Sequence, residues 1–212
     1  MLLAFDTATP AVAVALHDGD DVVVELAAEQ PMRHGEQLAP LVERALQEAG
    51  AVRQDLTAVA VGVGPGPFTG LRVGLVTART LGFVLEIPVY GVCTLDVLAV
   101  EAVDTGSVIG DFVVATDARR KEVYVASYDA EGHRLRGPAV ARPAEVATEA
   151  LVVGEGAALY PEHFPNGCPP LRPSAGWLAR TVADERAELR DPEPLYLRRP
   201  DAAVPGARKP AS

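Results

Sequence analysis

Short apolar runs separated by polar turns cover the first thirty residues of the chain. They predict three strands of a meander at residues 2–6, 11–16 and 21–28. Gly19 lies in the polar segment between the second and third runs, where its permissive backbone favours a tight turn. We therefore expect the chain to begin with a small antiparallel sheet.

Apolar residues at helical spacing follow, interrupted by runs of small β-forming residues. We expect helices at 35–49, 69–84 and 94–103, with buried strands at 58–63 and 88–92. Thr94 stands at the start of the third helix, where its hydroxyl group is expected to act as the N-cap. Alternating helices and strands of this kind predict an α/β fold.

The second half of the chain repeats this order in a shorter form. We expect strands at 111–116, 122–128, 134–141 and 151–153, and helices at 143–150 and 175–187. The loose repetition predicts two related α/β subdomains, the first more complete than the second. The last residues, 200–212, are rich in Ala, Pro and Gly and predict a flexible tail.

Composition and charge restrict the function classes. Of 212 residues, 49% are hydrophobic, and the formal net charge is −10. The chain can bury a core, but it lacks the basic balance of a free-standing nucleic-acid binder. Basic clusters at 119–121 and 198–199 are interpreted as solvated surface charges. If the chain works on RNA, we expect a partner to carry the charge.

The cysteines and histidines show no metal-site or disulfide pattern. Cys93 and Cys168 lie far apart, and the four histidines form no close ligand pair. The first apolar run ends at Asp6, and no run approaches the roughly 20 apolar residues of a membrane helix. We therefore expect a cytoplasmic protein with no metal, no intrinsic cofactor and no membrane contact.

The most specific motif is the glycine-rich loop at residues 62–74, which reads GVGPGPFTGLRVG and joins a buried strand to a helix. Backbone N–H groups at a helix N-terminus can bind an anion. However, no Lys follows the glycines as in a phosphate-binding loop, and two prolines remove backbone donors. A structural or interface turn and a direct anion contact both stay open.

Small residues at intervals of four mark one face of the helix after this loop: Gly70, Gly74, Ala78 and Gly82. Small side chains allow another element to approach closely. Val and Phe residues make the helix apolar around much of its circumference, as in a buried helix. Burial within the same chain and contact with a partner both stay open.

Residues 6–9, Asp-Thr-Ala-Thr, lie in the turn after the first strand. Acidic and hydroxyl side chains there could position a nucleotide phosphate and its magnesium ion. In the actin, Hsp70 and sugar-kinase superfamily the pattern is Asp-x-Gly-Thr, and a second loop reads Asp-x-Gly-Gly. Here Ala8 replaces the glycine, and Asp117 is followed by Ala-Arg-Arg. Asp6, Thr7, Thr9 and Asp117 are therefore candidates for a weak, degenerate nucleotide site.

These motifs occur in an order that resembles the TsaB family, also called YeaZ. The resemblance is carried by residues 3–9, 34–38, 62–74 and 194–198, and it covers residues 1 to 199. It implies an α/β fold of two actin-like (ASKHA, ribonuclease H-like) lobes, with mixed sheets flanked by helices. The implied division is 1–104 for the first lobe, 105–199 for a smaller second lobe and 200–212 for the tail.

The resemblance also implies a role in making N6-threonylcarbamoyladenosine, beside the anticodon of tRNA. TsaB would be a non-catalytic partner of the transferase TsaD, joined by the ATPase TsaE. ATP or ADP could be shared at the interface with TsaE, tRNA would be reached through the complex, and a homodimer could form when TsaD is absent. The implied partner interface maps onto two first-lobe helices, at His34, Leu38, Leu41, Val42, Leu71, Gly74, Leu75 and Ala78.

Two enzyme functions are the alternatives. An ATP-binding enzyme of the actin and sugar-kinase superfamily would need Asp6 and Asp117 to hold Mg-nucleotide. A glycoprotease-like peptidase is a label given to some members of the family. The sequence has no Gly-x-Ser-x-Gly elbow to support hydrolysis, so we expect a pseudo-enzyme subunit.

Overall fold

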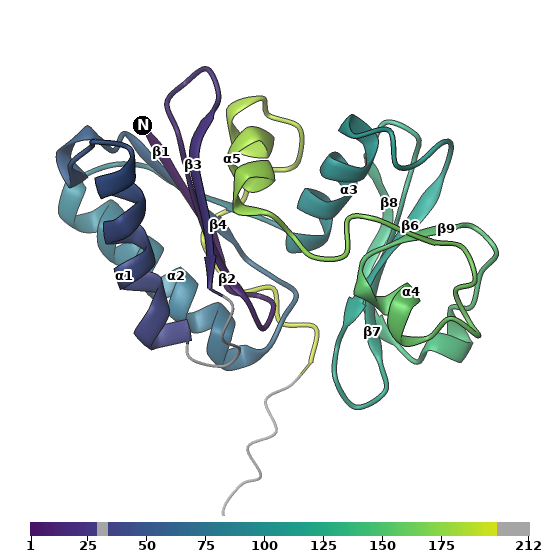
Figure 1. The fold of residues 1–212 in the computed structure, drawn as a ribbon. Helices are drawn as coiled ribbons and strands as arrows, with labels where there is room; N and C mark the ends of the chain where they lie inside the picture. The colour runs from purple at the N-terminus through teal and green to yellow at the C-terminus, as the bar shows by residue number, and fades with distance from the viewer. Residues whose placement is uncertain (29–33, 199–212) are drawn as a thin grey trace, which may run out of the picture.

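Two five-stranded sheets, each with helices against it, form the two lobes of the computed structural model (Figure 1). The structure describes residues 1–28 and 34–198, and of His34 the backbone alone. The elements between the N-terminus and the second lobe are β1 (Leu2–Asp6), β2 (Val12–His17), β3 (Val22–Ala28), α1 (His34–Glu48), η1 (Arg53–Asp55), β4 (Ala58–Gly62), α2 (Phe68–Leu85), β5 (Val89–Val92) and α3 (Thr94–Asp104).

The first sheet has the strand order β3-β2-β1-β4-β5, in which β1 pairs antiparallel with β2 and parallel with β4. Alternate side chains of a strand point to opposite faces, and the chain uses both faces. Leu3 and Phe5 of β1 pack with residues of α1 and α2, whereas Ala4 packs with Leu178 and Ala179. Helices therefore cover both sides of this sheet.

The second sheet has the order β10-β9-β6-β7-β8 and repeats the pairing of the first: β6 is antiparallel to β7 and parallel to β9. Its elements are β6 (Phe112–Asp117), β7 (Val123–Tyr128), β8 (Arg134–Ala141), η2 (Pro143–Glu145), β9 (Leu151–Val153), α4 (Glu155–Leu159) and β10 (Gly167–Cys168). The prediction of an α/β fold with two actin-like lobes and mixed sheets is confirmed.

A buried ion pair attaches α3 to the second sheet. The Asp96 carboxylate accepts a hydrogen bond from the Tyr128 hydroxyl group at 2.8 Å and lies 3.3 Å from the Arg134 guanidinium. Burial raises the pKa of Asp96, although Arg134 opposes the rise. Since removal of the Asp96 carboxylate leaves the buried Tyr128 hydroxyl group without this acceptor, the cluster stabilises the position of α3 beside β7 and β8.

The last helix, α5 (Ala175–Ala183), returns to the first lobe and packs against β1 and β2. This helix lies within residues 105–199, which the resemblance assigns to the second lobe, and it packs on the first sheet. The chain then runs back between the lobes. The Leu195 N–H group donates to the Val63 carbonyl group at 2.9 Å, and the Leu195 side chain contacts the cores of both lobes.

Two local predictions are wrong. Residues 143–150 form only the 3-10 turn η2, because Val146 is the one large apolar side chain of this segment and cannot supply an apolar helix face. Thr94 is the first helical residue rather than the N-cap, which is Cys93. The predicted tail, 200–212, lies outside the described residues.

Candidate functional site: a filled cleft and an exposed helix face

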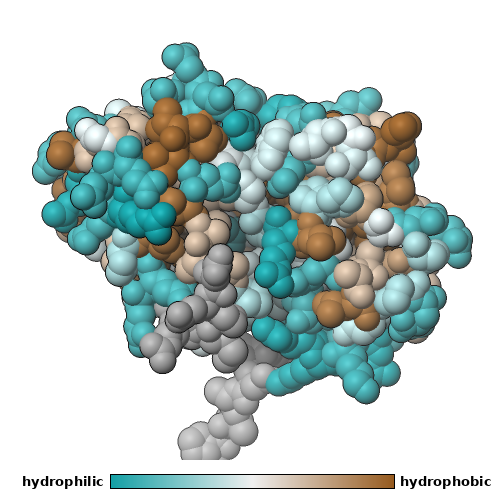
Figure 2. Space-filling view, viewed as in Figure 1, coloured by the Kyte–Doolittle hydropathy of each residue, from teal (hydrophilic) through white to brown (hydrophobic). Residues whose placement is uncertain are grey.

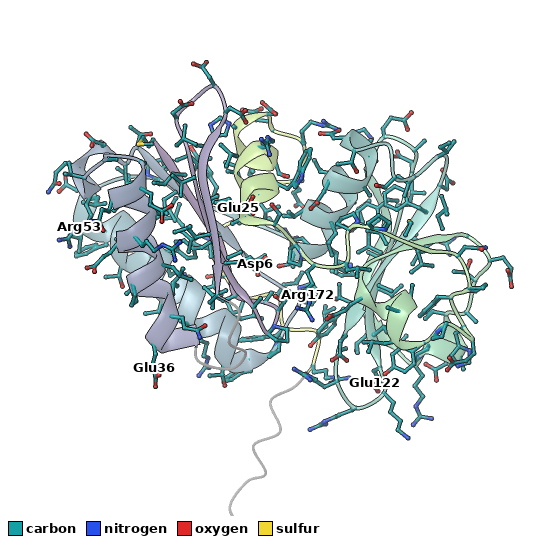
Figure 3. All side chains as sticks on the ribbon, in the orientation of Figure 1. Asp6, Glu25, Glu36, Arg53, Glu122 and Arg172 are labelled. Atoms are coloured by element: carbon teal, nitrogen blue, oxygen red, sulfur yellow. The ribbon has the colours of Figure 1, made fainter. Side chains whose placement is uncertain are left out.

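Asp6, the first candidate nucleotide ligand, is engaged within the chain. One carboxylate oxygen accepts the Ala8 N–H group at 2.6 Å, and the other accepts the Thr94 hydroxyl group at 2.8 Å. The residue is only 3% exposed and lies between the first sheet and the second lobe (Figure 3). The Thr94 hydroxyl therefore fixes the turn after β1 to the start of α3.

Thr7 and Thr9 are also hydrogen-bonded inside the first lobe. The Thr7 hydroxyl group donates to the Gly70 carbonyl group at 2.9 Å, and Thr7 is fully buried. The Thr9 hydroxyl group donates to the Ala11 carbonyl group at 3.3 Å. The turn that would bind phosphate in a nucleotide-binding relative of this fold thus contacts the glycine-rich loop of its own chain.

The glycines of that loop make this contact possible. A Cβ atom added to Gly62 would lie 1.9 Å from an Asp6 carboxylate oxygen, and one added to Gly74 would lie 2.4 Å from the Thr7 hydroxyl oxygen. At Gly66 it would lie 2.4 Å from the Ala8 carbonyl oxygen. At each of these three positions an added Cβ atom would overlap its neighbour, so the close packing requires glycine. Of the two interpretations left open for the loop, the structural turn is the one that this packing favours.

Asp117, the second candidate ligand, lies at the end of β6 across from this turn. Its carboxylate accepts the Arg119 N–H group at 2.8 Å and lies 3.5 Å from the Arg119 guanidinium. The cavity between the lobes at this point is lined by Asp117, Thr9 and Thr94 among others, and its volume is about 10 Å³. That is room for one water molecule at most, whereas ligand pockets measure about 300–1,000 Å³.

Among residues 1–28 and 34–198, no group of three His, Cys, Asp or Glu side chains could hold a metal ion. Asp6 and Asp117 lie near the same cleft, but each has its own partner inside the chain. A magnesium ion bound by oxygen ligands would share these carboxylate oxygens with the donors of the chain.

The predicted partner-interface residues pack inside the first lobe. They lie on α1 and α2 and are all buried: Leu38, Leu41, Val42, Leu71, Gly74, Leu75 and Ala78. The small residues of α2 let the helix approach β4, so burial within the chain accounts for their spacing. The eighth residue, His34, begins α1, and its side chain lies outside the described residues.

The opposite side of α2 carries exposed apolar side chains that the spacing argument did not single out. Val76 is 63% exposed, Phe83 86% and Val84 67%, and we call these three residues the α2 outer face. Positions seven and eight residues apart lie on one side of a helix. The sequence indicated this exposed face only indirectly, because it shows that the helix is apolar around much of its circumference.

By length and composition alone, α2 could span a membrane, and it is the one helix in the described part of the chain that meets this criterion. A helix that packs on a sheet through one face meets this criterion as well. Because the Gly70, Gly74 and Ala78 face is buried on the sheet, the α2 outer face is the part of the helix that can meet another molecule.

A stack of three side chains joins the C-terminal segment to the start of α2. The Phe68 and Tyr196 rings are 5.1 Å apart, and the Arg72 guanidinium lies 3.7 Å above the Phe68 ring. Arg72 also donates to the Tyr196 hydroxyl group at 3.2 Å. Sequence reasoning did not find this contact, because Tyr196 is separated from Phe68 and Arg72 by more than a hundred residues.

Comparison with known proteins places this arrangement in a family. A family model described as "TsaD: tRNA N6-adenosine threonylcarbamoyltransferase" matches residues 22–163. The tRNA threonylcarbamoyladenosine biosynthesis protein TsaB of Escherichia coli is 36% identical over 174 residues, which cover 76% of this chain and 74% of that protein. The chain belongs to the TsaB (YeaZ) family.

Solved structures agree with this membership. YeaZ from Pseudomonas aeruginosa has a TM-score of 0.74 and 32% sequence identity, over 92% of this chain and 99% of that chain. An uncharacterized protein of Mycobacterium tuberculosis is 46% identical over 95% of this chain and 93% of its own length. The TsaB family acts in the biosynthesis of threonylcarbamoyladenosine in tRNA, and the predicted family is confirmed.

Proposed function

We propose that the chain is a non-catalytic partner of a TsaD-type transferase in threonylcarbamoyladenosine biosynthesis, and that it docks through the α2 outer face. Two features together support the proposal: the cleft between the lobes is filled, and one face of α2 is apolar and exposed. Asp6 and Thr7, which a nucleotide enzyme of this fold would use for phosphate or magnesium, are hydrogen-bonded inside the chain.

The α2 outer face offers enough apolar area to contribute to docking. Full burial of a Val or Phe side chain contributes about 1.5–3 kcal/mol, and Val76, Phe83 and Val84 are each more than half exposed. Part of that gain offsets the loss of translational and rotational freedom on association. The surface is therefore suited to a stable complex when a partner supplies a matching apolar face.

The remaining parts of the proposal follow from the family. A TsaE-type ATPase joins the pair, ATP or ADP is shared at that interface, and tRNA is modified by the complex in the cytoplasm. Two copies of the chain pair through the same face when the TsaD-type protein is absent. The chain itself supplies binding surface rather than reacting groups.

Val76→Glu tests the docking face. Ala78 is unsuitable because it is fully buried against the sheet, and a charge there would disturb the fold. Val76→Glu places a charge on an exposed site, so the folded chain should persist while binding to the TsaD-type partner falls at least tenfold. Co-purification and isothermal titration calorimetry measure the affinity, and circular dichroism measures the fold.

Ile109→Glu is the matched control, because Ile109 is 90% exposed and lies outside the first-lobe helices. It should bind the partner as the natural chain does. Unchanged binding by Val76→Glu, or an equal loss in Ile109→Glu, would contradict docking through the α2 outer face.

A further inference from the structure

The hairpin between β6 and β7 carries three consecutive cationic residues at its tip: Arg119, Arg120 and Lys121. All three are exposed, and their φ angles are 61°, 57° and 60°. The Glu122 N–H group donates to the Arg119 carbonyl group at 3.0 Å, which closes a two-residue turn on Arg120 and Lys121. The hairpin projects at the lower edge of the second lobe in Figure 1, where Glu122 is labelled in Figure 3.

This backbone disfavours the residues that occupy it. In the left-handed region the Cβ atom of an L-residue lies too close to the following carbonyl oxygen. Two-residue hairpin turns with positive φ at both central positions therefore favour Asn-Gly. The three side chains are exposed, so core packing does not compensate. Residues that conflict with the preference of their backbone conformation cluster at functional positions.

Neighbouring groups hold the base of the hairpin in place. Arg198 donates to the Ala118 carbonyl group at 2.8 Å and forms an ion pair with Glu122. On the other side, the Asp117 carboxylate accepts the Arg119 N–H group at 2.8 Å. These contacts tie the tip to β6 and to the C-terminal segment, so that it is presented in one orientation.

The tip opposes the charge of the rest of the molecule, and the cavity beside it, among the described residues, is too small for an anion. The chain has a formal net charge of −10, and the adjacent cavity measures about 10 Å³. Figure 2 shows the lower edge of the second lobe as hydrophilic. A row of exposed cations on a projecting turn fits an extended line of phosphates, which cationic side chains contact without enclosing them.

We propose that the tip of the β6–β7 hairpin contacts the phosphate backbone of RNA. That this RNA is a tRNA rests on the proposed function. A direct contact between this chain and the RNA goes beyond the proposed function. Each cation that neutralises a phosphate releases bound counterions, so affinity falls as salt rises with a slope set by the number of contacts. The salt dependence of binding therefore reports on the hairpin.

The double variant Arg120→Asn/Lys121→Gly tests the proposal. Binding of an unmodified tRNA transcript is measured by fluorescence anisotropy across a salt series, with the chain alone and with its TsaD-type partner. The loss of two phosphate contacts should reduce the slope of log K against log salt by about 1.4–1.8. The same variant should unfold at a higher temperature, because Asn-Gly suits the turn. A structural role alone would not give weaker binding together with higher stability.

Arg53→Asn/Arg136→Asn removes the same charge at two exposed positions elsewhere, on η1 and β8. It should keep the natural slope. An unchanged slope in the hairpin variant, or an equal reduction in this control, overturns the proposal. So does a hairpin variant that loses Mg-ATP binding but keeps tRNA binding, because the phosphate would then belong to a nucleotide.

Size-exclusion chromatography of the same samples measures assembly with the partner. A hairpin variant that assembles normally but binds tRNA more weakly supports the RNA contact. If the natural chain does not assemble, the proposed function fails, and the slope measured on the chain alone still decides the role of the hairpin.

Discussion

Asp6→Ala is expected to lower the stability of the chain. The carboxylate is 3% exposed and accepts hydrogen bonds from the Ala8 N–H group at 2.6 Å and the Thr94 hydroxyl group at 2.8 Å. Truncation leaves both donors buried without these acceptors, and each such donor costs about 1–3 kcal/mol. The free energy of unfolding should therefore fall by about 2–6 kcal/mol, which is a large part of the total for a typical domain.

A fall of about 4 kcal/mol corresponds to a decrease of about 8–16 °C in the midpoint of thermal unfolding for a chain of this size. Asp6→Asn is the matched control, because the amide keeps the shape of the side chain and one acceptor oxygen. It should lower the free energy of unfolding by about 1 kcal/mol. Thr94→Val removes the hydroxyl donor alone and should give an intermediate loss.

Calorimetry and urea unfolding measure these differences, and titration with Mg-ATP is run on the same proteins. If Asp6→Ala unfolds within about 1 kcal/mol of the natural chain, the reasoning from its hydrogen bonds is refuted. A natural chain that binds Mg-ATP and an Asp6→Ala variant that does not would assign the carboxylate to a nucleotide instead.

Two further predictions concern stability. Gly66→Ala should lower the free energy of unfolding by about 1–3 kcal/mol, since its Cβ would lie 2.4 Å from a backbone oxygen. Gly35→Ala in α1 should not lower it in the same urea titration, because the nearest atom among the described residues is 4.0 Å away and Ala suits a helix better than Gly. Burial, with the Glu25 carboxylate adding to it, raises the pKa of Glu101 from 4.5 to about 7, so the folded chain keeps a proton that the unfolded chain releases. Stability should fall as pH rises from 4.5 to about 7, and Glu101→Gln should flatten that slope in urea midpoints measured across pH.

The strands and long helices could be predicted because their signals are local. Apolar runs and turn residues located β1 to β9 within a few residues. The spacing of Gly70, Gly74 and Ala78 likewise indicated a close-packed face of α2. What covers such a face depends on the rest of the fold, since a sheet and a partner helix both fit small residues. The sequence therefore could not separate the buried side from the α2 outer face.

The roles of the polar residues depended on contacts between distant parts of the chain. Asp6 has the sequence context of a magnesium ligand, and its meeting with Thr94 arises only when β1 and α3 pack together. The basic cluster at 119–121 was interpreted as solvated surface charges, because a residue type does not reveal its φ angle. Local patterns thus gave the elements of the candidate site, and tertiary contacts gave their roles.

The position of α5 has a consequence for synthesis on the ribosome. The chain emerges from its N-terminus, so β1 to β5 are available before α5, which covers the face carrying Ala4 and Ala60. Until residues 175–183 have left the exit tunnel, that face lacks α5 and is covered only in part, by α3 through Val97. The first lobe is therefore completed last, and truncated nascent chains leave part of its sheet open to solvent and to chaperones.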